Sequence, residues 1–180
     1  MEFDIFNITK ESIDRYIDDL VCIDNDVSEE LGQSYGNQIW DIGNFMKDLP
    51  KKWDYSFLVL SKDRICGFAI NSQMLQNELH INKFAISKQH RNMGIGSMLI
   101  KNIVDTANSD NCSAITVETS KMNAKARKFY ESNGFIQMTG DALKEYVNKR
   151  KDTSRVKCFD GFTREQDNSE FVILKKDIVF

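Results

Sequence analysis

The residues whose types and spacing best suit ligand binding lie in the loop of residues 89–97, between an expected strand ending at Ile86 and an expected helix. Gly94 and Gly96 have no side chain, so the backbone there can approach a ligand closely. The start of the following helix offers unpaired N–H groups and a positive dipole end, which favour phosphate oxygens, and Arg91 adds a permanent charge. This loop is therefore predicted to bind a pyrophosphate.

The common phosphate-binding motifs fit this loop incompletely. A dinucleotide fold requires G-x-G-x-x-G, but Leu99 stands where the third glycine belongs. A P-loop requires a lysine that this segment does not contain. A turn without a ligand remains an alternative, because G-x-G alone is a weak signal.

Three further residues, Glu118, Asn123 and Tyr130, carry polar side chains at a suggestive spacing. Tyr130 lies seven residues after Asn123, close to two helical turns, so both are expected on the same side of a helix. Glu118 shares one polar face of an expected strand with Thr116 and Ser120. The structural alternatives are a surface carboxylate for Glu118 and a packing residue for Tyr130.

The elements that must position these residues follow from hydrophobic periodicity. Helices are expected at 9–31, in part of 32–54, after the glycine loop from 95 to 107, at 123–133 and at 141–151, and strands at 56–60, 65–70, 78–86, 114–119, 135–138 and 170–179. Residues 152–169 are polar and show no assignable pattern. Strands that alternate with helices predict a single α/β domain, a mixed β-sheet with central parallel β-α-β crossovers flanked by helices.

Two sequence blocks resemble the GCN5-related N-acetyltransferase (GNAT) superfamily. The cofactor motif of that family, [Q/R]-x-x-G-x-[G/A], is similar to residues 91–96, and its block N-x-x-A-x-x-[F/Y]-Y-x-x-x-G-F is similar to residues 123–135. The resemblance covers about residues 55–140 well, the N-terminal part loosely, and residues 141–170 not at all. It implies one acetyltransferase domain over 1–180, with acceptor-side helices in 1–54, a cofactor core in 55–140, and a C-terminal helix, loop and last strand in 141–180.

The resemblance also implies acetyl-coenzyme A as the cofactor. The backbone of residues 91–97 would surround the pyrophosphate, the strand end at 84–86 would pair with the pantetheine arm, and Asn123 would contact the cofactor near that arm. The residues expected to bind the cofactor are Phe84, Ala85, Ile86, Arg91, Asn92, Met93, Gly94, Ile95, Gly96, Ser97, Asn123, Ala126 and Phe129.

Acetyl transfer to an amine requires that the ammonium lose a proton, that the oxyanion be stabilised and that the leaving thiolate gain a proton. By resemblance, Tyr130 is predicted to protonate the thiolate. Glu118 is predicted to be the general base, because the same Glu-to-Asn-to-Tyr spacing occurs in ribosomal-protein alanine acetyltransferases and streptothricin-type acetyltransferases. Glu78, His80 and a water relay remain alternatives for the base.

The charge distribution suggests the acceptor. Residues 1–54 carry 13 Asp and Glu against 5 Lys and Arg, a net charge of −8, whereas the remainder carries +5. An acidic acceptor side predicts a cationic small-molecule amine such as an aminoglycoside, streptothricin or polyamine, contacted by Asp24, Asp26, Glu29 and His80. The alternatives are a protein or peptide N-terminal amine, a non-catalytic acyl-CoA sensor, and an enzyme that uses a nucleotide-sugar or NAD.

Other classes of function lack support. The four cysteines and two histidines form no zinc pattern, no window is apolar enough for a membrane span, and no basic patch interleaved with aromatics indicates nucleic-acid binding. No signal peptide is evident, so a cytoplasmic location is expected. The oligomeric state is expected to be a monomer or a homodimer. The basic run of residues 149–157 departs from the family pattern, and we expect a solvated loop there.

Overall fold

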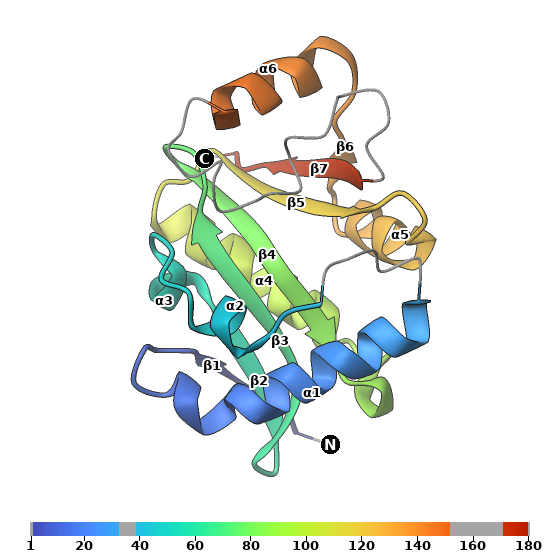
Figure 1. Ribbon diagram of the computed structural model, residues 1–180. Helices are drawn as coiled ribbons and strands as arrows, with labels where there is room; N and C mark the ends of the chain where they lie inside the picture. The colour runs from blue at the N-terminus through green and yellow to red at the C-terminus, as the bar shows by residue number, and fades with distance from the viewer. Residues whose placement is uncertain (1, 33–38, 152–170, 180) are drawn as a thin grey trace.

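The computed structural model describes residues 2–32, 39–151 and 171–179 (Figure 1). The strands are β1 (Asp4–Asn7), β2 (Phe57–Ser61), β3 (Arg64–Gln73), β4 (Glu78–Ile86), β5 (Ala114–Ser120), β6 (Ile136–Gln137) and β7 (Phe171–Asp177). The helices are α1 (Ile13–Leu31), α2 (Ile42–Met46), α3 (Lys52–Tyr55), the 3-10 turn η2 (Lys88–His90), α4 (Ile95–Ser109), α5 (Ala124–Ser132) and α6 (Gly140–Lys151). Each strongly periodic segment of the sequence forms its expected element, whereas β1 was not predicted.

One mixed sheet organises the chain, in the order β1-β2-β3-β4-β5-β7-β6. The neighbours β4 and β5 run parallel and are joined through α4, and every other neighbouring pair in this sheet is antiparallel. The connection from β5 through α5 reaches β6 with β7 inserted between the two strands. The predicted α/β fold with a mixed sheet and β-α-β crossovers is confirmed.

The two parallel strands diverge part of the way along their length (Figure 1). Their pairing covers four positions, from Glu78 opposite Ala114 to Ile81 opposite Val117. Beyond it, β4 continues to Ile86 with no pairing to β5. Asn82 is bulged out of the ladder with β3, since Ile81 and Lys83 are opposite adjacent β3 residues. A bulge bends its strand, which accounts for the point where β4 turns away from β5.

Two hydrophobic cores lie on opposite faces of the sheet because successive strand residues point to opposite sides. The first core packs α4 and α5 against the sheet and includes Leu79, Ile81, Leu99, Ile103 and Val117. The second core packs α1 and α2 against the other face and includes Leu20, Phe45, Leu58, Phe68 and Ile70. Within the described part of the chain, no helix has the length and apolarity needed to cross a membrane.

Candidate active site

The predicted phosphate loop leads directly into α4. Gly94 is the N-cap residue, with φ of 81°, and Asn92 before it also has a positive φ of 61°. A glycine tolerates that conformation without strain and caps no N–H group of the first turn with a side chain. The amides of residues 95–97 therefore start a 15-residue helix at its positive end, which suits an anion. Met93 is exposed, whereas the Ile95 side chain is buried in the first core, so Ile95 can contact a cofactor only through its backbone.

Gly96 is required for a reason that the sequence did not suggest. A Cβ atom at this position would lie 2.9 Å from Cε2 of Phe129, well inside normal contact distance. Gly96 thus allows α4 to pack closely against the aromatic ring that α5 presents.

Arg91 is engaged with the protein itself. Its Nη1 donates to Glu30 Oε2 at 2.6 Å, and its Nε donates to the Ile86 carbonyl at 3.2 Å. Lys125 of α5 lies 3.9 Å from the other oxygen of Glu30. The hydrogen bond from Arg91 lowers the pKa of Glu30. These contacts join the end of α1, the phosphate loop and the start of α5.

An aromatic cluster lines the stretch of β4 that has left β5. The ring of Phe84 lies 5.5 Å from Phe129 and 6.1 Å from Tyr130, and Tyr130 lies 5.4 Å from Phe135. Phe84 and Ile86 pack against the first core, whereas Ala85 belongs to the second. Tyr130 is 5% exposed, and burial raises its pKa above the ordinary value. Its phenol therefore keeps its proton throughout the neutral pH range.

Asn123 caps α5. Its side-chain oxygen accepts a hydrogen bond from the Ala126 N–H at 3.0 Å, and this satisfies one of the unpaired donors of the first turn. Ala126 itself packs against the first core. Asn123 thus has a structural role as the cap of α5, and its contact with the cofactor remains a prediction from the family resemblance.

Glu118 is the first residue of β5 beyond the last pair with β4, and it points to the face of the sheet opposite α4. Its side chain is 16% exposed, and Oε2 lies 3.8 Å from Nη1 of Arg150 on α6. Burial raises the pKa of Glu118 to about 7, although the charge of Arg150 acts to lower it. A carboxyl group with that pKa can exchange a proton at neutral pH.

The other candidate bases are less well placed. His80 is 2% exposed, and its Nδ1 lies 2.9 Å from Thr116 Oγ1. Burial lowers the pKa of His80 well below the ordinary value, so the ring is neutral. Burial also raises the pKa of Glu78, but Glu78 stands at the start of β4, at the far end of the ladder from the divergence.

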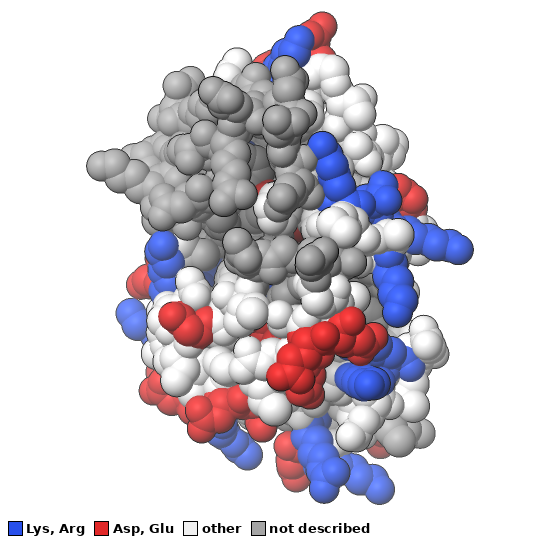
Figure 2. Space-filling view, turned by 45° about the vertical axis from the view of Figure 1, so that its right-hand side comes forward, with Lys and Arg blue, Asp and Glu red and all other residues white. Residues whose placement is uncertain are grey.

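The acidic residues of α1 divide into two groups. Asp24 is fully buried, forms an ion pair with Lys83 at 2.7 Å and accepts a hydrogen bond from the Trp40 N–H at 2.8 Å. Asp24 is therefore not the open surface carboxylate that the helix pattern suggested. Asp26 and Glu29 are exposed. In Figure 2, Asp and Glu side chains gather near the middle of the face shown, beside a group of Lys and Arg side chains.

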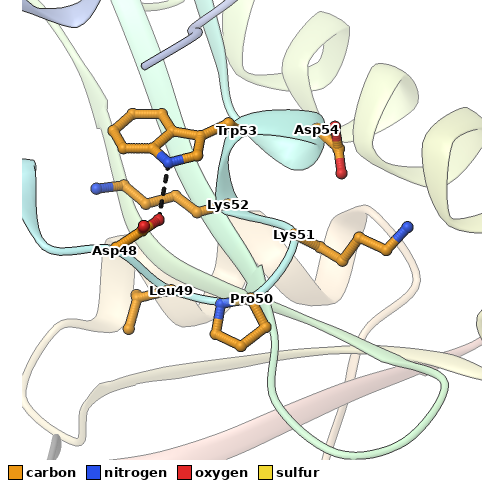
Figure 3. Close-up of a pocket in the computed structure, with 7 residues that line it drawn as sticks. All are labelled: Asp48, Leu49, Pro50, Lys51, Lys52, Trp53 and Asp54. Carbon is orange, nitrogen blue, oxygen red and sulfur yellow. Dashed lines mark hydrogen bonds between the residues drawn. The ribbon is translucent and has the colours of Figure 1, made fainter.

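A separate hollow of about 500 Å³ lies in the loop that links α2 to α3, and it is lined by residues 48–54 (Figure 3). Lys52 is fully buried there and donates to the carbonyls of Phe45 and Lys47, while Trp53 Nε1 donates to Asp48 Oδ1 at 2.9 Å. None of the predicted site residues lines this hollow. Among the described residues, no group of three or more His, Cys, Asp and Glu could hold a metal ion.

Sequence reasoning missed the polar residues that α6 brings to the sheet. Tyr146 and Arg150 are 4% and 5% exposed, and the Tyr146 hydroxyl donates to Thr116 Oγ1 at 3.1 Å. The available signal was their i, i+4 spacing, which places both on one face of a helix. Most of the basic run of residues 149–157 lies outside the described residues.

Comparison with known proteins identifies the family. Residues 23–135 match the family model described as "Acetyltransferase (GNAT) family". The fold is similar to the ribosomal-protein-S18-alanine N-acetyltransferase of Escherichia coli, with 15% identity, a TM-score of 0.64, and coverage of 99% of this chain and 96% of that one. It is also similar to Ard1 of Thermoplasma volcanium (16% identity, TM-score 0.67, 100% of both chains). The PaiA N-acetyltransferase of Thermoplasma acidophilum, solved with coenzyme A, shows 11% identity and a TM-score of 0.67 over 98% of this chain and 99% of that one.

Proposed function

Because this chain belongs to the GNAT acetyltransferase family and is an acyltransferase, we propose that it moves the acetyl group of acetyl-CoA directly to a primary amine in a ternary complex. The observation that carries this proposal is the position of Glu118. A largely buried carboxyl group with a pKa of about 7 stands where β4 and β5 separate.

The residues present fit the cofactor. The amides at the start of α4 would hold the pyrophosphate, together with the backbone of Arg91, Asn92 and Met93. The edge of β4 at residues 84–86, which has no pairing with β5, offers backbone groups to the amides of the pantetheine arm. Asn123, Ala126 and Phe129 would border that arm from α5.

The chemistry then needs three proton transfers. Glu118 takes a proton from the acceptor ammonium, and the freed nitrogen lone pair attacks the thioester carbonyl. The C–N bond forms, the C–S bond breaks, Tyr130 gives its hydroxyl proton to the departing thiolate, and the second proton that the nitrogen must lose returns to Tyr130. A phenol whose pKa is raised by burial is neutral before this step, as an acid must be.

For the acceptor, we propose a cationic small-molecule amine, and the exposed carboxylates of Asp26 and Glu29 on α1 support this. Asp24 is paired with Lys83, so we propose that it supports the structure of the acceptor side and does not attract the substrate as an exposed charge. His80 shapes the acceptor side as a buried neutral ring. The alternative is a peptide amine, which is favoured by the Glu-to-Asn-to-Tyr spacing and by the structural similarity to the ribosomal-protein acetyltransferase.

The test is release of free thiol from acetyl-CoA with spermidine, an aminoglycoside panel, streptothricin, a basic peptide, and neutral and acidic amines. We expect turnover with cationic amines, and loss of about 100-fold or more in kcat for Glu118→Gln and Tyr130→Phe, as for removal of a general base or acid. Reaction of only neutral or acidic amines would refute the acceptor class. If coenzyme A binds, no amine is turned over and Tyr130→Phe does not alter the binding, a non-catalytic acyl-CoA sensor is favoured.

A further inference from the structure

Helix α6 follows the segment that matches the family model, yet it buries two polar residues against the acceptor-side face of the sheet. Tyr146 and Arg150 are one turn apart and nearly fully buried. Their neighbours on α6, Glu145 and Lys149, pair with each other at 2.7 Å on the exposed side. The helix thus presents a polar contact face to β5 and a solvated face to water.

A hydrogen-bonded chain fixes the position of α6. The Tyr146 hydroxyl donates to Thr116 Oγ1, which is also 2.9 Å from His80 Nδ1. Thr116 has one hydroxyl proton and two lone pairs on its oxygen, so its hydroxyl can bond both Tyr146 and His80. This chain links α6, β5 and β4, and the Arg150 guanidinium carbon lies 5.6 Å from the Tyr146 ring centre.

Several charged and titratable groups surround this part of the sheet. Helix α6 supplies Tyr146, Lys149 and Arg150, strand β4 supplies Glu78 and His80, and strand β7 supplies Lys175 and Asp177. Among the described residues, Arg150 is the one whose charge lowers the pKa of Glu118. Arg150 Nη1 lies 3.8 Å from Glu118 Oε2. Both side chains are largely withdrawn from water, so solvent screens this attraction only weakly.

We propose that Arg150 is a positioning residue of the acceptor site, which holds the Glu118 carboxylate in place from α6 and stabilises its charge. This inference rests on the proposed role of Glu118 as the base. Burial by itself disfavours an ionised carboxylate, and an adjacent guanidinium counteracts that effect. Arg150 therefore sets how much of the base is ready to accept a proton at neutral pH.

The direct test needs no acceptor. The full-length protein is labelled with glutamate enriched in ¹³C at the side-chain carboxyl, and the Glu118 signal is the one missing from Glu118→Gln. We expect its titration midpoint near pH 7 in the unmodified protein. In Arg150→Gln it should rise by about one pH unit or more, as for loss of an opposite charge within about 4–6 Å. Lys149→Gln removes the neighbouring exposed charge and should leave the midpoint unchanged.

Arg150→Met, which keeps a long side chain, provides a second uncharged variant if the glutamine variant does not fold. Arg150→Lys keeps the charge and should leave the midpoint near that of the unmodified protein. An unchanged midpoint in the uncharged variants, or a full shift in Arg150→Lys, overturns the proposal.

The pH dependence of kcat/KM, measured with the best acceptor of the amine panel, separates the two proposals. We expect the acidic limb of Arg150→Gln to move upward, with about fivefold lower activity at pH 7 and recovery near pH 9, for a midpoint raised by about one unit. Full activity of Glu118→Gln would refute the base and this inference together. An inactive Glu118→Gln with an unmoved limb in Arg150→Gln would refute the role of Arg150 alone.

Discussion

Glu118→Gln should stabilise the folded protein above pH 7 while it reduces catalysis. Glutamine resembles a protonated carboxyl group, so the variant removes the free energy needed to bury the ionised form. The pKa of Glu118 is about 7 in the fold against an ordinary value of 4.5, and at 1.36 kcal/mol per pKa unit the difference is about 3 kcal/mol. With the side chain 16% exposed, we take this figure as an upper limit.

The sign of the effect follows from linkage. A carboxyl group whose pKa is raised on folding contributes stability below pH 4.5, and that contribution is lost as the pH rises through 7. The two proteins should therefore be equally stable near pH 4.5, and the variant should be more stable by up to about 3 kcal/mol at pH 8. For a domain of this size that corresponds to roughly 6–12 °C in Tm.

Urea unfolding of both proteins at pH 4.5, 6 and 8 measures the difference. Glu131→Gln, at an exposed position on α5, is the matched control and should show no such dependence on pH. If Glu118→Gln gains no stability between pH 4.5 and 8, the Glu118 carboxylate is not desolvated, and the physical basis for its role as a base is refuted.

Three further predictions concern stability, each measured by urea unfolding. Lys83→Met should cost about 3–5 kcal/mol because it leaves the Asp24 carboxylate buried without its ion-pair partner, and Lys83→Met combined with Asp24→Leu should recover most of the loss. Gly96→Ala should destabilise the fold by about 1–3 kcal/mol through the clash with the Phe129 ring, and the double variant with Phe129→Leu should recover part of this loss. Asn123→Ala should cost about 1 kcal/mol by removing the cap of α5, whereas Asn123→Asp should not. Equal stability of any single variant and the unmodified protein would contradict the contact that it tests.

The elements around the proposed cofactor site were largely predictable because their constraints are local. Hydrophobic periodicity locates β4, α4, β5 and α5, and the loop before α4 contains the glycine needed at the N-cap position. The positive φ of Gly94 belongs to the local turn into α4, so a glycine at this position can be recognised from the nearby sequence alone. The predicted contribution of Gly96 was incomplete, since its neighbour Phe129 is distant in sequence and meets it only through tertiary packing.

The proposed acceptor side depends on contacts between distant segments, which a pattern of residue types does not contain. The sequence of α1 places Asp24 among acidic neighbours, but its partner Lys83 lies on β4. Likewise, nothing near Arg150 in the sequence indicates that it meets Glu118. Strand β1 escaped prediction because it is four residues long and mostly exposed, so it has too little alternation to reveal a strand.

The placement of β7 has a consequence for how the chain folds as it is synthesised. This strand is made after all the other described strands, yet it lies inside the sheet between β5 and β6. Until it arrives, β5 presents an unpaired edge that carries the apolar residues Ile115 and Val117, a template for pairing with another chain. The nascent chain therefore stays exposed to aggregation at this edge until the late, long-range pairing of Val117 with Leu174 forms.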